Sequence, residues 1–203
     1  MTLNLKNLLN PKVKISKMGE FQELQPIAGL ELSAVSADLY GDGRDDLTLF
    51  YFKDGANSAA VYTSSKVTSA SINWNLKTKK NFVKALMVNT KNANTFTGIK
   101  GAQGLKEIAL ALAKALTLKS SQTSKGVSEV VKITDLIFSS TGVIGEEFPY
   151  LKIKNRIPEL VKKLKIEQNK FVWFKAASAI MTTDTRPKVA YEECKIGNKL
   201  IKI

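Results

Sequence analysis

The sequence predicts a mixed α/β domain, in which the strands of a sheet alternate with helices that cover it. Short apolar runs bounded by turn residues, which are typical of strands, alternate along the chain with segments of helical periodicity. The 203 residues are enough for one large domain or two small ones. Apolar residues make up 44% and charged residues 24% of the chain, which is typical of a globular protein.

The first part of the chain, residues 27–75, is expected to form β structure. The apolar run Leu47–Phe52 lies between two Asp-Gly turns, and residues 59–63 are expected to be its partner in a hairpin. Another buried strand is predicted over residues 82–88, which are almost wholly apolar.

The clearest helix follows these strands. Its apolar residues are spaced by three, four, seven and eleven positions from the first, so they share one face of a helix. They are Leu105, Ile108, Ala109, Leu112 and Leu116. Residues 119–128 are rich in serine and lysine and are expected to form a loop.

The second half of the chain repeats this alternation. A strand is predicted over residues 130–140, and a turn that contains glycine follows it. Helices are predicted over residues 153–165 and 170–180, and Pro158 is tolerated if it lies in the first turn. Residues 199–203 alternate polar and apolar side chains, as a strand does at its start.

The chain is strongly basic, with 31 Lys and Arg against 18 Asp and Glu and a net charge of +13. Such a charge is typical of proteins that bind nucleic acid. However, only three of the 31 basic residues are arginine, the side chain that recognises phosphate with two parallel hydrogen bonds. The lysines are also spread along the chain. A lysine-rich nucleic-acid-binding module is therefore kept as the second interpretation.

Histidine is absent, and Cys194 is the single cysteine. These counts exclude a histidine-based catalytic triad, a histidine-ligated metal, a zinc cluster and an internal disulfide within the chain. A reducing compartment, the cytoplasm, fits this composition. No apolar stretch reaches the roughly 18 residues of a membrane-spanning helix, and the N-terminus lacks the apolar core of a signal peptide.

Three polar segments are candidates for a functional site. They are residues 89–98 (NTKNANTFTG), 139–146 (SSTGVIGE) and 181–188 (MTTDTRPK). A strand that runs into a Ser/Thr/Gly turn can present a hydroxyl and backbone N–H groups to an anion or a developing oxyanion. Each segment taken alone is equally typical of turns and helix caps.

A fourth segment, Asp38 to Asp46 (DLYGDGRDD), resembles a calcium-binding loop. Oxygen ligands at alternate positions around a glycine suit Ca²⁺. Tyr40 stands where an oxygen ligand is needed, and the loop occurs once, whereas such loops come in arrays. A plain Asp-Gly turn is the preferred interpretation, and a calcium-binding β module is the third.

Taken in order, the segments resemble the ornithine acetyltransferase family. The matching stretches are Val88–Gly101 (VNTKNANTFTGIKG), Ser139–Ile153 (SSTGVIGEEFPYLKI) and Ala176–Ala190 (AASAIMTTDTRPKVA), and residues 45–70 look like the family's first hairpin. The specific part is the pair TGVIGE and AIMTTDTxPK in this order. The resemblance extends over residues 25–203.

This resemblance implies a fold and an activity. The fold would be the layered α/β fold of N-terminal-nucleophile-like aminopeptidases. The activity would be acetyl transfer from N-acetylornithine to glutamate in arginine biosynthesis, through an acetyl-threonine intermediate. In the family, the precursor cuts itself between an alanine and a threonine, and the new N-terminal threonine becomes the nucleophile. The free amine of that threonine can act as its base, so no histidine is required.

The resemblance also assigns residues. Thr141 and Gly142 would form the oxyanion hole, Thr182 would contact the substrate, and its neighbour Thr183 would assist. No metal and no cofactor are implied, and whether acetyl-CoA also serves as a donor stays open. The expected partners are N-acetylornithine, glutamate and the beta chain with the nucleophilic threonine, in a heterotetramer of two alpha and two beta chains.

Residues 1–24 are expected to be an N-terminal extension, and residues 25–203 the alpha-chain region of the acetyltransferase domain. In the family, a glycine-rich stretch with a substrate-binding lysine comes next, before the self-cleavage site. The resemblance therefore implies a fragment that is inactive without the second chain. Two residues depart from the family: Asp38 stands where a turn glycine is usual, and Ser65 stands where asparagine is common.

Overall fold

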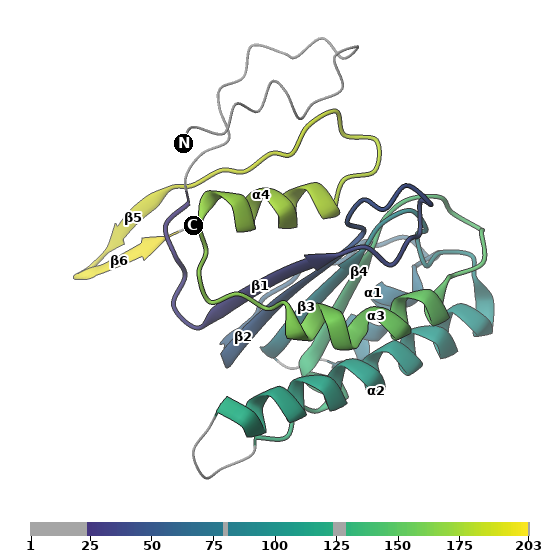
Figure 1. The fold of residues 1–203 in the computed structure, drawn as a ribbon, viewed down its shortest axis with the longest axis horizontal. Coiled ribbons are helices and arrows are strands. Elements are labelled where there is room, and N and C mark those ends of the chain that lie inside the picture. Colours follow the sequence, from purple (N-terminus) through teal and green to yellow (C-terminus); the bar gives the residue numbers. More distant parts are fainter. Residues whose placement is uncertain (1–23, 79–80, 124–128, 203) are drawn as a thin grey trace.

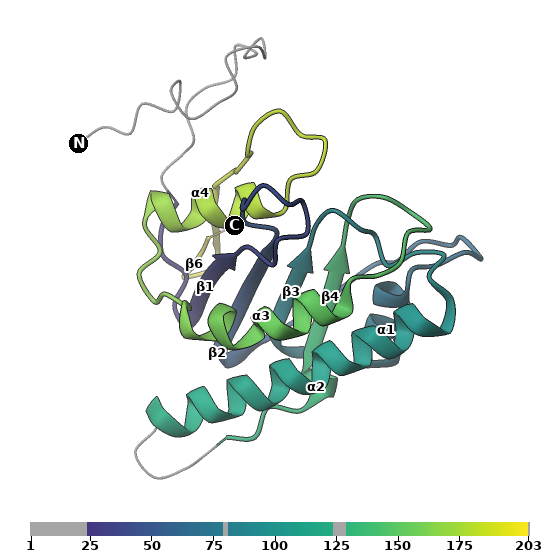
Figure 2. The ribbon, with the colours of Figure 1, turned by 45° about the vertical axis from the view of Figure 1, so that its right-hand side comes forward.

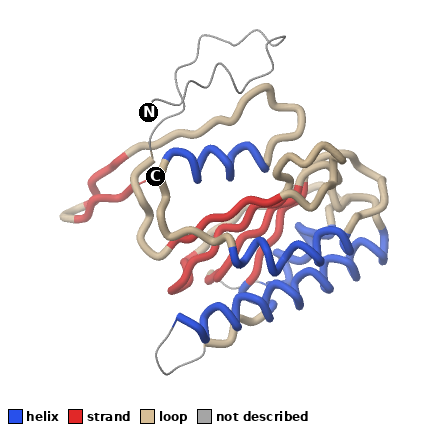
Figure 3. Tube along the Cα trace, in the orientation of Figure 1, coloured by secondary structure: helices blue, strands red, loops and turns tan. Residues whose placement is uncertain are grey.

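The structure is a computed structural model that describes residues 24–78, 81–123 and 129–202. Its centre is a four-stranded sheet with helices on both faces (Figures 1 and 3). The strands lie in the order of the chain: β1 (Leu30–Val35), β2 (Leu47–Asn57), β3 (Phe82–Asn89) and β4 (Leu136–Ser140). The predicted mixed α/β architecture is confirmed. The residues that precede β1 include the predicted extension, most of which (residues 1–23) lies outside the described residues.

The strand directions decide where loops gather. β2 is antiparallel to both β1 and β3, whereas β4 is parallel to β3. Consequently β1, β3 and β4 run in the same direction, and their carboxyl ends lie at one edge of the sheet. The segments after them, residues 36–46, 90–97 and 141–149, therefore leave the sheet at that same edge (Figure 2).

Two helices, α2 (Gly98–Thr123) and α3 (Tyr150–Lys162), cover one face of the sheet (Figure 2). The predicted apolar face of α2 is confirmed, because all five of its residues are buried. α3 buries a similar face against the sheet and α2. The side chains that join the sheet to these helices are Val35, Leu47, Leu49, Ala85, Met87, Leu136, Phe138, Ile153, Ile157 and Leu160.

The opposite face is covered over β1 and β2 by α4 (Lys170–Ala179). Side chains alternate between the two faces of a strand, so Leu47 and Leu49 face α3 while Thr48 and Phe50 face α4. The Thr48 hydroxyl lies 3.4 Å from the Ala176 carbonyl oxygen, and the Phe50 and Trp173 rings are 6.5 Å apart. β1 is covered on both faces, which explains why all six of its residues are buried.

A fourth helix, α1 (Ala70–Thr78), lies along the free edge of β4. The Trp74 indole N–H donates to the Leu136 carbonyl oxygen at 2.9 Å, and its ring packs against Phe138. The prediction of β structure over residues 27–75 is therefore wrong for residues 70–75, which begin this helix. Tertiary contacts with β4 override the local pattern here.

Other boundaries also differ from the predictions. Residues 59–63 form no strand, because β2 takes β1 and β3 as partners instead of a hairpin mate. α2 continues through residues 119–123, and the rest of the predicted loop, 124–128, lies outside the described residues. α3 starts at Tyr150, so Pro158 is not in the first turn; it lies on the exposed side of the helix, where water can bond the freed carbonyl.

The last described residues form a separate two-stranded antiparallel sheet, β5 (Glu193–Ile196) and β6 (Lys199–Lys202). The predicted strand at 199 is confirmed, whereas β5 was not predicted. A single 3₁₀ turn, η2 (Ile133–Asp135), precedes β4 where a longer strand was expected. None of the described helices is both long and apolar enough to cross a membrane.

Candidate active site

Three loops are joined by backbone hydrogen bonds at the carboxyl edge of β1, β3 and β4. The Thr90 N–H and hydroxyl, just after β3, donate to the Asp46 carbonyl oxygen at 3.0 and 3.3 Å. The Thr141 N–H, just after β4, donates to the Asn89 carbonyl oxygen at 3.0 Å. The last residue of β3 and the residue after it therefore hold the loops on both sides.

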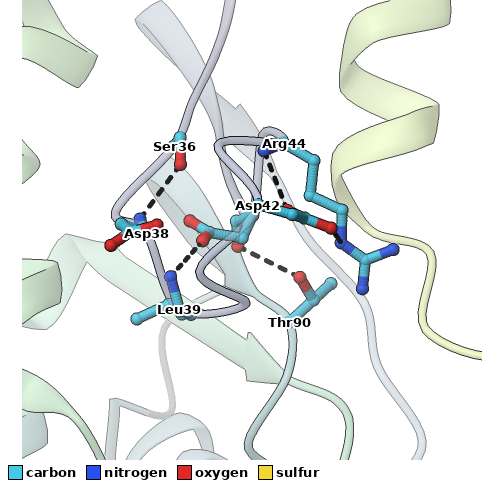
Figure 4. Close-up of polar contacts among 7 residues, drawn as sticks. Ser36, Asp38, Leu39, Asp42, Arg44 and Thr90 are labelled. Atoms are coloured by element: carbon cyan, nitrogen blue, oxygen red, sulfur yellow. Dashed lines mark hydrogen bonds and ion pairs between the residues drawn. The ribbon is translucent and has the colours of Figure 1, made fainter.

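The loop between β1 and β2 is organised by the buried carboxylate of Asp46. Its two oxygens accept the N–H groups of Ala37 and Leu39, each at 2.7 Å. Figure 4 shows the bond from the Leu39 N–H. Burial raises the pKa of the Asp46 carboxyl, and the two N–H groups partly oppose this rise. Asp38 has a φ of +55°, so this loop keeps the left-handed backbone of the turn glycine that the family resemblance implies.

The same loop does not have the contacts of a calcium site. Asp42 accepts the Arg44 N–H at 3.0 Å (Figure 4). The Arg44 guanidinium lies over the Tyr40 ring, 3.2 Å from its centre. Asp46 is already used by the backbone. Within the described residues, no group of three or more His, Cys, Asp or Glu side chains is placed to hold a metal ion.

The segment between β3 and α2 is centred on Asn94, which is fully buried. Its N–H donates to the Ser140 hydroxyl at 2.9 Å, and its side-chain amide donates to the Gly101 carbonyl oxygen at 3.0 Å. Its carbonyl oxygen accepts the Ala70 N–H at 2.8 Å. Asn94 thus connects the start of α1, the end of β4 and the start of α2.

The turn after β4, residues 141–146, contains the two residues expected to form an oxyanion hole, Thr141 and Gly142, and for that expectation it is called the oxyanion turn below. The N–H groups of Thr141 and Val143 donate to Asn89 and Lys91, at 3.0 and 2.9 Å, and so continue the parallel ladder between β3 and β4. Alternate peptide groups point to opposite sides of an extended chain. The Gly142 N–H therefore points away from β3, to the side of β4 along which α1 lies, called the outer edge of β4. No hydrogen bond in the described part of the chain uses this N–H.

The outer edge of β4 is otherwise occupied. The carbonyl oxygens of Leu136 and Phe138 accept hydrogen bonds from side chains of α1. Further along the strand, the Ser140 hydroxyl lies 3.2 Å from the Ser71 hydroxyl. Gly142 is the next residue that faces this edge and lies beyond these α1 contacts. The helix α1 therefore covers the outer edge of β4, and the Gly142 N–H, just beyond the contacts of α1, is left open.

Glycine is required at this position. Gly142 has a φ of +131°, and a Cβ there would overlap the carbonyl group of Lys91. The neighbouring Thr141 is half-buried, and its hydroxyl bonds to no other described residue. A hydroxyl and an N–H on adjacent residues, both accessible, are the donors that an oxyanion hole needs.

The other two predicted site residues follow α4. Thr182 is half-buried and Thr183 is exposed. Lys175 on α4 forms an ion pair with Asp45 at 3.1 Å, so this end of the helix is tied to the loop between β1 and β2. That loop lies between the segment after α4 and the oxyanion turn in both views (Figures 1 and 2). The contacts of α4 with β2 and Asp45 thus put the C-terminal end of this helix, which Thr182 follows, at the same end of the sheet as Thr141 and Gly142. Among the described residues, no hydrogen bond joins the two pairs.

Several residues of this edge were not singled out by sequence reasoning. Ser140 and Asn94 lie inside segments that were, but the pattern did not indicate their hydrogen bonds. Asn75 on α1 gave no signal at all, because its partner lies 63 residues away in the chain. The one feature of the sequence that could have indicated this cluster of buried polar side chains is the asparagine-rich stretch, residues 89–98, after the strand predicted over residues 82–88.

Comparison with known proteins now decides the family. Residues 31–203 match the sequence pattern of the ArgJ family. The chain belongs to the ArgJ family. The arginine biosynthesis bifunctional protein ArgJ of Caulobacter vibrioides is 36% identical over 187 residues, 90% of this chain and 42% of that protein. Its counterpart in Bartonella quintana is 34% identical over 194 residues, 94% of this chain and 43% of that protein. This ArgJ-family chain therefore spans less than half the length of these curated relatives.

Solved structures agree with the ArgJ assignment. The arginine biosynthesis bifunctional protein argJ of Bacillus halodurans has a TM-score of 0.70 at 24% identity, over 87% of this chain and 84% of that one. The ornithine acetyltransferase of Mycobacterium tuberculosis, solved in complex with ornithine, has a TM-score of 0.69 at 25% identity, over 85% and 86%. The resemblance to ornithine acetyltransferases and the predicted N-terminal-nucleophile-like fold are both confirmed.

Proposed function

We propose that this ArgJ-family chain takes part in arginine biosynthesis by acetyl transfer from N-acetylornithine to glutamate, through an acetyl-threonine intermediate. The observation that carries the proposal is the open Gly142 N–H beside the unbonded Thr141 hydroxyl at the end of β4. In this proposal the nucleophilic threonine belongs to a second chain, so residues 25–203 act as the alpha-chain region of the enzyme.

The reaction that we propose is the one implied by the family resemblance, and it uses these donors. The amine of the N-terminal threonine takes the proton of its own hydroxyl, whose oxygen bonds to the acetyl carbon of N-acetylornithine. The acetyl oxygen becomes negative and accepts hydrogen bonds from Gly142 and Thr141. The C–N bond then breaks, the leaving nitrogen takes the proton, and ornithine departs. In the second half, the glutamate amine attacks the acetyl ester and restores the threonine hydroxyl.

Substrate contacts are assigned to the segment after α4. Thr182 and its neighbour Thr183 follow α4, whose C-terminal end lies at the same end of the sheet as the oxyanion turn, and the Mycobacterium tuberculosis relative was solved in complex with ornithine. We propose that Thr182 holds the substrate and that Thr183 assists it. A chain with a charge of +13 also favours the approach of glutamate, which is an anion.

The test compares residues 1–203 alone with the same residues combined with a second chain that carries the nucleophile. We expect transfer of labelled acetyl from N-acetylornithine to glutamate only in the combination, with acetyl on the nucleophilic threonine by mass spectrometry. A parallel reaction with acetyl-CoA decides whether that donor is used. The mass of the assembly tests the heterotetramer of two alpha and two beta chains. Transfer by residues 1–203 alone, or none by the assembled pair, would contradict the proposal.

The lysine-rich nucleic-acid-binding interpretation is a distinct candidate, and the observation in its favour is the net charge. Several lysines form ion pairs within the chain: Lys84 with Glu129, Lys154 with Glu107, and Lys175 with Asp45. Filter binding of duplex DNA and RNA from low to moderate salt separates the two functions. Affinity that falls steeply with salt and persists in a Thr141→Ala variant would favour the nucleic-acid function.

A further inference from the structure

We propose that Asn92 and Glu146 are a pair of positioning residues that fix the direction of the Gly142 N–H. This inference rests on the proposed function, because it concerns the same oxyanion turn. Neither residue is assigned a contact with substrate. They act through the backbone of the turn, and they are called the Asn92–Glu146 clamp below.

The first half of the clamp is held rigidly. Asn92 is buried, and its carbonyl oxygen accepts the side-chain N–H of Asn89 at 3.0 Å. Its backbone pairs with Val143 as an isolated parallel bridge, and the next N–H, that of Ala93, donates to the Val143 carbonyl oxygen at 2.9 Å. The Asn92 side chain therefore starts from a fixed backbone beside the oxyanion turn.

The second half of the clamp closes the turn. The Asn92 side-chain N–H donates to a carboxylate oxygen of Glu146 at 2.6 Å, across 54 residues of sequence. A hydrogen bond to an ionised acceptor is shorter and stronger than one between neutral groups. One residue earlier, the Gly145 N–H donates to the Thr95 carbonyl oxygen at 3.0 Å. The far end of the turn is thus fastened to the segment after β3, as its near end is.

Gly142 lies between these two fastenings, where the backbone needs support. Lys91 has a φ of +74°, an uncommon value for a residue with a side chain, and Gly142 packs against its carbonyl group with a φ of +131°. Uncommon backbone conformations persist where the surrounding contacts hold them in place. Loosening the clamp would therefore let the Gly142 peptide rotate away from its functional direction.

The experiment uses the chain assembled with its nucleophile-bearing partner and four variants. Asn92→Asp places a carboxylate against Glu146 and breaks the bond. Glu146→Gln keeps an acceptor. The double variant Asn92→Asp/Glu146→Gln restores the bond with donor and acceptor exchanged. Glu147→Gln is the matched control, because Glu147 is an exposed neighbour with no partner among the described residues.

Asn92→Asp is expected to lower kcat about 10- to 100-fold with KM within about twofold, since complete removal of an oxyanion donor costs about 100- to 1000-fold. Glu146→Gln and Glu147→Gln should stay within about threefold of wild type. The double variant should regain at least about tenfold over Asn92→Asp. Full kcat in Asn92→Asp would overturn the proposal, and so would a double variant that recovers nothing.

A second readout is independent of activity. In ¹⁵N–¹H spectra of this chain, the Gly142 amide signal should shift in Asn92→Asp, return in the double variant and stay in place in Glu147→Gln. If the assembled wild type transfers no acetyl group, the proposed function fails while this measurement still tests the clamp. An unmoved Gly142 signal in Asn92→Asp would remove the clamp, whatever the activity.

Discussion

The side-chain amide of Asn75 forms with Phe138 the two hydrogen bonds that a neighbouring strand would otherwise form. Its N–H donates to the Phe138 carbonyl oxygen at 2.9 Å, and its oxygen accepts the Phe138 N–H at 3.0 Å. An edge strand with unpaired backbone groups is open to pairing with other chains. Because Asn75 occupies both backbone groups of Phe138, the middle of β4 is not available for pairing with another strand.

Replacing this amide should destabilise the fold. Asn75→Ala leaves the two backbone groups of Phe138 without partners, which should lower the free energy of unfolding by about 1–3 kcal/mol. Urea unfolding followed by circular dichroism measures this. Asn73→Ala is the matched control on the same helix. Asn73 is exposed and its side chain accepts one exposed hydrogen bond, from the Thr68 hydroxyl at 2.7 Å, so this substitution should change stability by less than about 0.5 kcal/mol. Equal effects of the two substitutions would contradict the role of Asn75.

The two glycines of the oxyanion turn should respond differently to an added methyl group. Gly142→Ala combines backbone strain with overlap against Lys91, so it should cost at least about 2 kcal/mol of stability. Gly145 also has a positive φ, of +85°, but nothing lies within 4 Å of the position that a Cβ would take there, so Gly145→Ala should cost only about 1 kcal/mol. Thermal unfolding of both variants is the measurement, and equal losses would show that Lys91 imposes no constraint.

Thr141→Ala should lower turnover far more than it changes stability. The residue is half-buried and its hydroxyl bonds to no other described residue, so the fold loses little. In the assembled enzyme, removal of one oxyanion donor should reduce kcat about 100- to 1000-fold. Thr141→Ser keeps the hydroxyl and should retain most of the activity. Unchanged turnover in Thr141→Ala would exclude Thr141 from the mechanism.

Thr182→Val should act on substrate binding. Loss of one hydrogen bond to the substrate should raise KM for N-acetylornithine about 3- to 10-fold and leave kcat nearly unchanged. Thr185→Val is the control, because Thr185 is exposed in the same segment. Steady-state kinetics of both variants give the answer, and a normal KM in Thr182→Val would remove Thr182 from the substrate site.

Asp46 should make stability depend on acid pH. Its folded pKa is raised above the ordinary value of 3.8, chiefly by burial, so between these two values the folded state holds more protons than the unfolded state. The contribution of Asp46 to stability therefore falls as pH rises from 3.8 through the folded pKa. Asp46→Asn removes this fall, although its amide cannot accept both N–H groups. Unfolding free energies of both proteins from about pH 3.5 upward should differ in slope, and parallel curves would contradict the assignment.

How far the sequence predicted the molecule depends on how local each interaction is. The face of α2 was predicted because its apolar spacing is set by the helix itself. α1 was missed because its contacts with β4 lie 62 and 63 residues away. The positions of Thr141 and Gly142 came from family resemblance. The unpaired Gly142 N–H beside Thr141 depends on the register between β3 and β4, which the sequence of one strand alone does not reveal.

The contacts of α1 also bear on the order of folding. The helix precedes β3 and β4 in the chain, yet its bonds to Phe138 span 63 residues and the Asn94 bond to Ser140 spans 46. Contacts of such long range are slow to form, because the intervening chain must first be closed into a loop. We therefore expect the Gly142 N–H to reach its open position beyond the α1 contacts only in a late stage of folding.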